Sequence, residues 1–452
     1  MMEQRKLRFD SVLLPTGWAR DVCVSIDEGG LISNIQTSSK DGERISGITV
    51  PGMANLHSHA HQRLMQGLAE RAGPGADSFW TWREVMYGFA LKLSPEDLEA
   101  VAAQAYAEML CSGFTSVGEF QYLHHQPGGS PYENRAEMSL RCLAAADSAG
   151  IATTLLPVLY SHGGFGGAAP NQGQRRFIND VDGFLDIYEI INDALHGHHQ
   201  LGIAPHSLRA VTKTGLDAVL ESTPQGQPVH IHVAEQTKEV EDCLAWSKQR
   251  PVEYLLSHFN VNKNWCAIHA THMLEHEVRV LAASGAVAGL CPTTEANLGD
   301  GIFPAIEFIN AGGKFGIGSD SHITISPAED LRMLEYSQRL KHHTRNALAD
   351  GAGLSTGRSI FERALKGGAQ ALQQNMGAIE IGGRADFVVL NDDHHALLGR
   401  AEDAALDALI FSGGNACVRD VYAGGKLQVK DGLHVNATTI KNNFKKTIER
   451  LA

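Results

Sequence analysis

The alternation of apolar and polar segments along the chain predicts an α/β architecture. Between residues 48 and 320, short apolar runs alternate with longer amphipathic stretches that have helical spacing, such as 94–113. The apolar runs are predicted strands: 48–57, 114–120, 152–160, 201–206, 228–234, 265–270, 286–292 and 314–320. Eight strand–helix repeats are the number that a (β/α)8 barrel requires.

The stretch 94–113 also carries the signals of a helix start. Its first residues supply a Ser N-cap, a Pro at the first helical position and acidic residues in the first turn. We therefore expect this helix to begin directly after Ser94.

Both ends of the chain have strand character. Turn signals separate short predicted strands at the beginning, and two later segments return to strand character after a predicted helix at 355–375: 6–14, 21–27, 30–36, 377–391 and 418–432. Because domain termini often lie close together, we expect the two ends to form a small discontinuous β-sandwich domain. The predicted organisation is a β-domain (1–50), a barrel (51–375), the second part of the β-domain (376–430) and a C-terminal helix (431–452).

Length and composition fit this division. The 452 residues exceed a barrel of about 250 residues, which leaves material for smaller units. Hydrophobic residues make up 43% and charged residues 20%, as in globular proteins. The net charge of −13 argues against nucleic acid or an anionic membrane as a partner. A few local arginines could still bind a small acidic substrate.

Cysteine usage and the N-terminal segment indicate a cytoplasmic protein. The seven cysteines are scattered and form no CxxC pair, which is typical of reduced thiols. Residues 1–15 lack the apolar core of a signal peptide, and no apolar run reaches the roughly 18 residues of a membrane span.

Five candidate metal ligands lie at or just past the ends of the predicted strands. They are His57, His59, His232, His269 and Asp320. A barrel displays its chemistry at the carboxyl ends of its strands, and imidazoles with a carboxylate suit a hydrolytic zinc or iron site. An aspartate buried at a strand end is costly unless a cation or metal compensates its charge, which favours a functional Asp320.

Spacing narrows the choice among the histidines. His57 and His59 are two apart on a strand ending and therefore share one face, although an isolated H-x-H also occurs by chance. His230 and His232 share a face as well. His232 is nearer the carboxyl end and is the predicted ligand, whereas His230 is predicted to be packed against or to support the site. His272 competes with His269 one turn later.

Three further features lie near these candidates. Glu235 follows His232 by three positions and is a candidate for proton transfer; the alternative is a first-turn glutamate favoured by the helix dipole. His322 is expected beside Asp320 without binding the metal. Residues 163–173 are Gly-rich and predict a mobile active-site loop. Most of the remaining histidines lie in polar stretches and are predicted to be solvated: 124, 125, 196, 198, 199, 342, 343, 394 and 395.

Taken in order, the segments PGMANLHSH, HIHVAEQ, AIHATH and GIGSDSH resemble the amidohydrolase superfamily, and GGRADFVVLN strengthens the resemblance. It covers essentially the whole chain. The resemblance implies that His57, His59, His232 and Asp320 bind the metal and that His269 lies beside it, contacting the metal or the reacting water. Dinuclear members use a bridging carboxylated lysine near the fourth strand. Residues 201–211 contain no lysine, so the expected cofactor is one divalent metal ion, with zinc implied by the resemblance.

The spacing from His232 to Glu235 is typical of the deaminase branch, whose members hydrolyse C–N bonds at amidine-type carbons and release ammonia. Arg209, and Arg83 in a predicted loop after the first barrel strand, suggest an anionic substrate. The planar guanidinium binds carboxylates through two parallel hydrogen bonds. The alternative for each arginine is a surface salt bridge.

Within this branch, HSHAHQRLMQGLAE, SFWTWRE, GEFQYLHH and PHSLR are similar to members that deiminate a linear amidine in histidine degradation. The resemblance implies five substrate-binding residues: Gln62, Arg83, Tyr122, His206 and Arg209. Tyr122 could equally be a core aromatic residue. The expected reaction is hydrolysis of N-formimino-L-glutamate to N-formyl-L-glutamate and ammonia. The expected partners are a small substrate with carboxylates and a second copy of the chain in a homodimer.

The implied mechanism gives each catalytic candidate a role. Asp320 accepts the proton of the attacking water, His269 stabilises the new oxygen, and Glu235 passes a proton to the leaving nitrogen. Three alternatives remain: a mononuclear deaminase of a nucleobase, triazine or adenosyl compound; imidazolonepropionase; and a non-catalytic barrel scaffold, which would be expected to have lost ligands.

Overall fold

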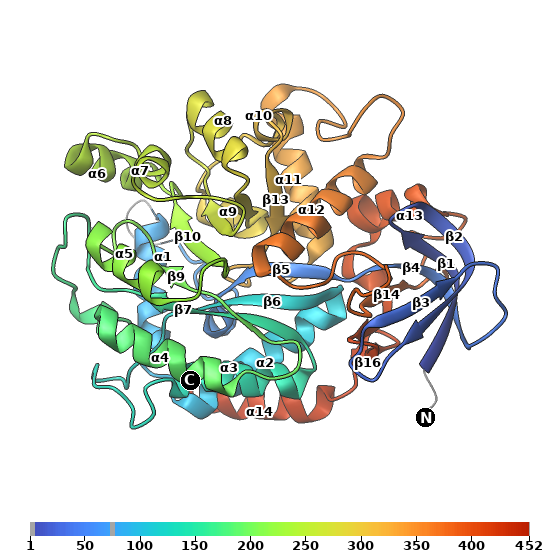
Figure 1. Cartoon of the computed structure of the whole chain (residues 1–452), viewed down its shortest axis with the longest axis horizontal. Helices are drawn as coiled ribbons and strands as arrows, with labels where there is room; N and C mark the ends of the chain where they lie inside the picture. The colour runs from blue at the N-terminus through green and yellow to red at the C-terminus, as the bar shows by residue number, and fades with distance from the viewer. Residues whose placement is uncertain (1–4, 73–76, 452) are drawn as a thin grey trace.

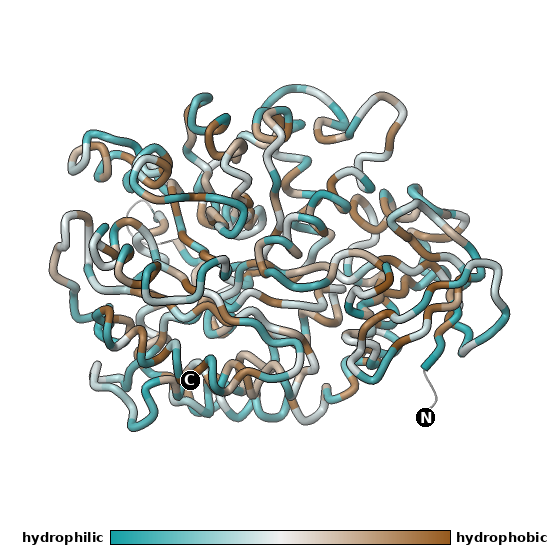
Figure 2. Tube along the Cα trace, in the orientation of Figure 1, coloured by the Kyte–Doolittle hydropathy of each residue, from teal (hydrophilic) through white to brown (hydrophobic). Residues whose placement is uncertain are grey.

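The computed structural model describes residues 5–72 and 77–451 as an α/β body with a sheet at one side (Figure 1). Apolar segments concentrate in the inner strands, and hydrophilic segments cover many of the outer turns and helices (Figure 2). Within the described residues, no helix combines the length and the apolar composition that crossing a membrane requires.

Strands from both ends of the chain share one eight-stranded sheet, of order β17-β16-β15-β14-β4-β1-β2-β3. Its strands are β1 (Arg5–Leu14), β2 (Gly17–Ile26), β3 (Ile32–Gln36), β4 (Glu43–Pro51), β14 (Phe387–Leu390), β15 (Val418–Ala423), β16 (Lys426–Lys430) and β17 (Leu433–His434). The two ends meet where β14 pairs antiparallel with β4. These strands pair as one sheet, so the two-layer sandwich stays a prediction. The domain boundaries at 50, 375 and 430 also stay predictions.

Two parallel sheets form the centre of the molecule. One joins β5 (Met53–Ser58), β6 (Phe114–Gln121), β7 (Ala152–Leu159) and β8 (Gln200–Leu201), with β9 (Ala204–Pro205) also paired to β7. The other joins β10 (Val229–Val233), β11 (Trp265–His269), β12 (Val287–Leu290) and β13 (Lys314–Ile317). Each of the eight predicted runs includes strand residues, and the run at 201–206 includes β9 and the last residue of β8.

The predicted strand 48–57 is wrong in one respect, because it divides at Gly52. Residues before this glycine belong to β4 in the eight-stranded sheet, and those after it belong to β5. A Cβ at Gly52 would lie 2.3 Å from the Thr115 hydroxyl oxygen, so only glycine allows the chain to pass so close to β6.

The two parallel sheets approach each other at both edges. Isolated parallel bridges pair Ile203 with Val229 at one edge and Ser58 with Asp320 at the other. At the second edge, the Asp320 N–H donates to the His57 carbonyl at 3.0 Å. These bridges bring the carboxyl end of β5 beside the residues that follow β13.

Helices cover the central strands from two sides. In Figure 1, α2, α3 and α4 lie below β6 and β7, while α8 to α11 lie above. The helices are α1 (Phe79–Ala90), α2 (Pro95–Ser112), α3 (Glu137–Ala149), α4 (Val181–Ala194), α5 (Lys213–Ser222), α6 (Thr237–Ser247), α7 (Pro251–His258), α8 (Glu275–Ser284), α9 (Pro292–Leu298), α10 (Ala305–Asn310), α11 (Pro327–His342), α12 (Thr356–Leu372), α13 (Asp403–Ala408) and α14 (Ala437–Leu451). Short turns of other helix types are η1 (Ala60–Met65), η2 (Gln172–Gln174), η3 (Leu409–Gly413) and η4 (Gly414–Cys417).

The start of α2 follows its predicted capping. The Asp97 N–H donates to the Ser94 hydroxyl at 3.2 Å, and the Ser94 N–H donates to the Asp97 carboxylate at 2.8 Å. These reciprocal bonds satisfy two backbone donors that the first helical turn leaves without partners. The prediction for this helix start is confirmed.

Candidate active site

The five predicted ligands come together at the carboxyl ends of strands from both parallel sheets. Each parallel strand leaves its last side chains at the same edge, which gathers residues distant in sequence. The local backbone is unusual, because several non-glycine residues at these strand ends have left-handed φ values. They are Ala234 (52°), His269 (66°), Ala270 (48°), Asp320 (47°) and His322 (58°). Such conformations cost about 1–3 kcal/mol each and gather at functional sites.

Three imidazoles form the centre of the cluster. The Nε2 atom of His57 lies 3.2 Å from that of His59 and 3.0 Å from that of His232. The carboxylate of Asp320 completes the group, with Oδ1 3.6 Å from His57 Nε2 and 3.4 Å from His59 Nε2.

The hydrogen bonds around these rings fit a bound cation. His59 Nδ1 donates to the Phe120 carbonyl at 3.0 Å, and His232 Nδ1 donates to the His206 carbonyl at 2.9 Å. Each ring therefore keeps an Nε2 lone pair that faces the common centre, as in metal-ligating histidines. Burial lowers the pKa of His59 to about 3, and it lowers the pKa values of His57 and His232 well below their usual range. Neutral imidazoles are the form that binds a metal, so the donor set fits a divalent ion.

A second titratable group adjoins the ligands. His269 Nε2 lies 3.7 Å from Glu235 Oε1 and 3.8 Å from Asp320 Oδ2. Burial raises the pKa of Asp320 to about 7 and also raises the pKa of Glu235. Burial alone would lower the pKa of His269, but the carboxylates around it, Glu235 first, raise that pKa to about 10. Strongly perturbed acids and bases in one cleft are typical of a catalytic site.

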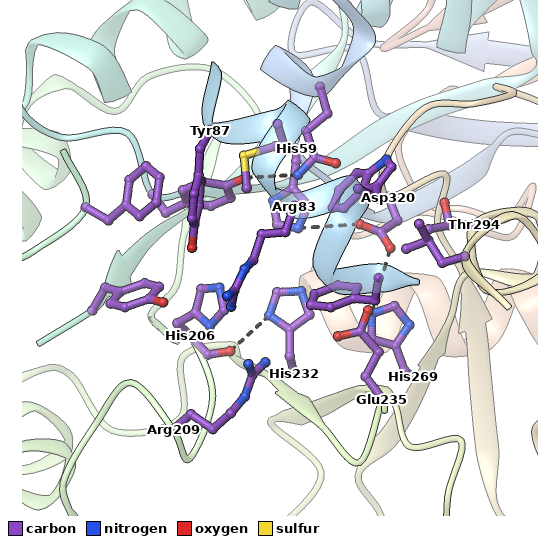
Figure 3. A pocket seen from close by; sticks show the side chains of 18 residues that line it. His59, Arg83, Tyr87, His206, Arg209, His232, Glu235, His269, Thr294 and Asp320 are labelled. Carbon is purple, nitrogen blue, oxygen red and sulfur yellow. Dashed lines mark hydrogen bonds and ion pairs between the residues drawn. The ribbon is translucent and has the colours of Figure 1, made fainter. Parts of the chain in front are cut away.

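A pocket opens above this cluster and contains about 630 Å³ of space between atoms, part of it open to solvent. Its lining includes nearly all the predicted site residues, among them Gln62 and Tyr122. Figure 3 labels eight others around one space: His59, Arg83, His206, Arg209, His232, Glu235, His269 and Asp320. His57 is fully buried beneath them. The Gly-rich loop 163–173 contributes no lining residue, and its mobility stays a prediction.

Two arginines, Arg83 and Arg209, line the pocket. The prediction that Arg83 lies in a loop is wrong, because this residue lies on α1. This helix belongs to the connection from β5 to β6, and Ser78 is its N-cap. The guanidinium carbon of Arg83 is 4.5 Å from the Trp80 ring centroid, and that of Arg209 is 5.7 Å from it. Among the described residues, neither arginine forms an ion pair, and the Nε atoms of both are buried without a hydrogen-bond partner. Both observations disfavour the alternative that each arginine forms a surface salt bridge.

The other predicted substrate residues pack beside these arginines. Gln62 Nε2 donates to the Tyr122 hydroxyl at 2.9 Å. The Tyr122 ring lines the pocket and also lies against Phe177, with centroids 5.0 Å apart, so it has both a pocket face and a core face. His206 lines the pocket with its ring and orients His232 with its carbonyl.

Supporting histidines divide into two groups. His230 is buried and its Nε2 contacts the Ala371 carbonyl at 2.8 Å, whereas His322 lies between Ser58 and Ser319 at 3.0 and 2.9 Å. The prediction that most remaining histidines are solvated is wrong for His124 and His125. Both are buried and contact backbone carbonyls, since the segment after β6 turns inward.

Sequence reasoning missed several buried acids around the cluster. Glu119 accepts hydrogen bonds from the Ser58 hydroxyl at 2.5 Å and the Ala60 N–H at 2.9 Å. Glu295 Oε1 lies 3.2 Å from His269 Nδ1, and Asp300 lies close to Glu235 and His269. The available signal was an acidic residue inside, or shortly after, an apolar strand run.

The amidohydrolase family model matches residues 48–428, and the chain belongs to the amidohydrolase family. The fold and the strand-end ligand cluster agree with this membership. The chain is 50% identical over 428 residues to formimidoylglutamate deiminase of Pseudomonas aeruginosa, covering 94% of each sequence. It is 26% identical over 381 residues to 5-methylthioadenosine/S-adenosylhomocysteine deaminase of Haloarcula marismortui, covering 82% of this chain and 80% of the relative.

A solved structure gives the same picture of the fold. The crystal structure of an amidohydrolase from Brucella melitensis superposes with a TM-score of 0.94 and is 52% identical, covering 99% of this chain and all of that one. The likeness therefore extends over both the parallel sheets and the sheet made from the chain ends.

Proposed function

We propose that this protein hydrolyses N-formimino-L-glutamate to N-formyl-L-glutamate and ammonia. The observation that carries the proposal is that one pocket contains both a metal-ligand cluster and two arginines, neither of which has an ion-pair partner among the described residues. The 50% identity to formimidoylglutamate deiminase supports the same substrate. The 26% identity to the adenosyl deaminase gives that alternative less support.

The ligand cluster supplies the hydrolytic chemistry. A divalent ion held by His57, His59, His232 and Asp320 would act as a Lewis acid and lower the pKa of a water molecule. The His269 Nε2–H donates a hydrogen bond to the oxygen that forms on the formimino carbon, a kind of stabilisation worth about 3–4 kcal/mol elsewhere.

The carboxylates move the protons. Asp320 accepts a proton from the attacking water, since Oδ2 faces His269 and the pocket. Glu235 then delivers a proton to the formimino nitrogen. The formimino nitrogen enters as the protonated amidinium, so this second proton makes it a leaving group; the bond from carbon to nitrogen then breaks and ammonia leaves. The remaining hydroxyl proton passes to the Glu235 carboxylate, and the water oxygen becomes the formyl carbonyl oxygen.

The arginines determine which substrate is held over the cluster. Arg83 and Arg209 bind the two carboxylates of the glutamate moiety, and this fixes the reacting carbon. Gln62, Tyr122 and His206 line the intervening wall. Both guanidinia point into the pocket in Figure 3, so a dicarboxylate would give each arginine the ion-pair partner that it lacks among the described residues.

We infer one zinc ion as the resident metal. Neutral imidazoles with a carboxylate suit zinc, although iron and manganese accept the same donors. The residues at β8 and β9 include no lysine that could be carboxylated to bridge two ions. Elemental analysis of the purified holoenzyme should give about one zinc per chain, and two metal equivalents would contradict the inference.

Further properties follow as proposals. We infer that the parallel sheets close into one (β/α)8 barrel, which the bridges Ile203–Val229 and Ser58–Asp320 support. We also infer a cytoplasmic enzyme of histidine degradation, supported by cysteines that are all free. The resemblance implies a homodimer, which light scattering on the purified protein would test.

Ammonia release tests the substrate assignment directly. The metal-loaded enzyme should turn over N-formimino-L-glutamate and not guanine, cytosine or S-adenosylhomocysteine. Arg209→Met and Arg83→Met should each raise KM about 10- to 100-fold, because a charge-assisted hydrogen bond contributes about 1.5–3 kcal/mol. Arg20→Met, an exposed arginine outside the pocket, is the matched control. Unchanged KM in both pocket variants would exclude the carboxylate assignment.

A further inference from the structure

His269 has an acidic oxygen at each ring nitrogen. Its Nε2 faces Glu235 and Asp320 at 3.7 and 3.8 Å, and its Nδ1 lies 3.2 Å from Glu295 Oε1. Glu295 is not a lining residue of the pocket and therefore does not reach the substrate. Its side chain contacts His269 at Nδ1, the ring nitrogen on the far side from Glu235 and Asp320.

The contact decides between two orientations of the ring. The terminal torsion of a histidine is roughly two-fold, so a half-turn of the ring replaces its nitrogens by carbons at nearly the same positions. The stacking of His269 on His232, with centroids 5.6 Å apart, fixes the plane of the ring but tolerates either orientation. A carboxylate only accepts hydrogen bonds, so Glu295 requires an N–H on the Nδ1 side.

Glu295 is itself held firmly enough to impose this choice. It lies on α9, and its Oε1 accepts the Cys291 N–H at 2.9 Å, where β12 ends and α9 begins. The side chain is buried, with 5% of its surface exposed. A buried carboxylate fixed by a backbone donor offers one stable acceptor position to the imidazole.

We propose that Glu295 is a positioning residue: its hydrogen bond from His269 Nδ1–H directs Nε2 toward Glu235, Asp320 and the reacting oxygen. The expected effect on turnover rests on the proposed function, whereas the orientation of the ring does not. Loss of comparable outer partners of metal-site histidines costs about 10- to 100-fold in activity or metal affinity.

Two substitutions of Glu295 separate the hydrogen bond from the charge and the packing. Glu295→Gln keeps an acceptor oxygen at the same position, so kcat should stay within about tenfold of wild type. Glu295→Leu removes the acceptor, so kcat should fall up to about 100-fold, with KM and bound metal unchanged. If the leucine variant does not fold, Glu295→Asp takes its place, because it withdraws the acceptor by one methylene.

The matched control is a buried glutamate far from the pocket lining. Glu335 on α11 is fully buried and accepts the N–H groups of Ala347 and Leu348 at 2.8 and 2.9 Å. Glu335→Gln should lower Tm while kcat per folded enzyme stays unchanged. If Glu295→Leu behaved in the same way, the role of Glu295 would be structural and the proposal would be wrong. A glutamine variant as slow as the leucine variant would also overturn it.

NMR of the imidazole nitrogens in holoenzyme with ¹⁵N-labelled histidine gives a readout that needs no substrate. The signals that disappear in His269→Gln are those of the His269 ring. Wild type and Glu295→Gln should show His269 protonated at Nδ1 and hydrogen-bonded there, and Glu295→Leu should lose that hydrogen-bonded signal. An unaltered signal in Glu295→Leu overturns the proposal. Should the wild type fail to release ammonia from N-formimino-L-glutamate, the proposed function fails while the NMR comparison still decides the role of Glu295.

Discussion

Glu235 lies between the metal-ligand cluster with His269 and the arginine side of the pocket, and charges from both sides act on its carboxyl group. Burial raises the pKa of its carboxyl, whereas His269 and Arg209 both lower it. Burial is the largest of these effects, so the pKa of Glu235 stays raised, and a carboxyl group with a raised pKa can carry the proton that a leaving nitrogen requires.

Glu235→Gln should therefore lower kcat by about 10²–10⁴-fold, because the amide cannot carry the proton. The metal content and KM should change little, since Glu235 is outside the predicted ligand set. Ammonia release and elemental analysis on the same preparation provide the measurement. Turnover near the wild-type rate would show that another group carries the proton.

At the residue scale, the sequence pattern located the strand-end residues of the metal-ligand cluster, but it did not locate the buried acids that contact them. His57, His59, His232, His269 and Asp320 were predictable because each lies at the end of an apolar run, and parallel strands bring such ends together. Which roles they have stays a prediction. Glu295 was not predictable in the same way, since its contact with His269 depends on the direction in which α9 leaves β12.

At the element scale, α9 and α11 are joined at their first turns beside the active site. Asp330 Oδ1 accepts hydrogen bonds from the Thr293 N–H at 3.1 Å and the Thr293 hydroxyl at 2.8 Å. Asp330 is fully buried, and burial raises the pKa of its carboxyl to about 8. The folded protein thus keeps a proton on this group that the unfolded chain loses near pH 4.

This shift predicts a pH-dependent loss of stability. Between about pH 4 and 8 the folded state binds more protons at Asp330 than the unfolded state, so its contribution to stability falls as pH rises. Asp330→Asn removes that titration. Its Tm relative to wild type should therefore rise between pH 5 and pH 8, by at least about 2 °C.

The neighbouring Glu329→Gln is the matched control, because Glu329 lies on the same turn with 39% of its side chain exposed. Burial raises the Asp330 pKa more than the charge of Glu329 does, so the Tm difference between Glu329→Gln and wild type should change less with pH than that of Asp330→Asn. Thermal unfolding of all three proteins across this range is the measurement, and parallel curves for wild type and Asp330→Asn would contradict the assigned pKa.

Most strands and helices of the chain were predictable from the pattern of apolar and polar residues. The points at which a predicted strand is interrupted were not. The run 48–57 is uniformly apolar, yet it belongs to two different sheets because Gly52 passes against Thr115. The segment 377–391 was predicted as a strand, but the strand itself is limited to Phe387–Leu390, with one isolated bridge from Arg384 to Leu31, since Gly382 has a left-handed φ of 86° and turns the chain. Both divisions depend on contacts with residues distant in sequence.

At the scale of the whole molecule, a buried ion pair connects the terminal sheet to the central strands. Arg384 and Asp386 precede β14 and are only 2% and 3% exposed. Arg384 also donates to the Thr115 carbonyl on β6 at 3.0 Å, and Asp386 accepts the Thr115 hydroxyl at 3.0 Å. The GGRADF segment, which contributes to the resemblance seen in the sequence, therefore connects the two sheets.

Removing one member of this pair tests how far the molecule depends on this connection. Arg384→Met leaves the Asp386 carboxylate buried without its cation, so the free energy of unfolding should fall by about 3–5 kcal/mol. Because the pair lies outside the pocket lining, kcat well below Tm should stay unchanged. Arg44→Met is the control, since its pair with Asp10 in the same sheet is exposed and should contribute little. Denaturant unfolding measures the free energy of unfolding, and ammonia release measures kcat. If Arg384→Met and Arg44→Met lowered the free energy of unfolding equally, the contact between the two sheets would not depend on the buried ion pair.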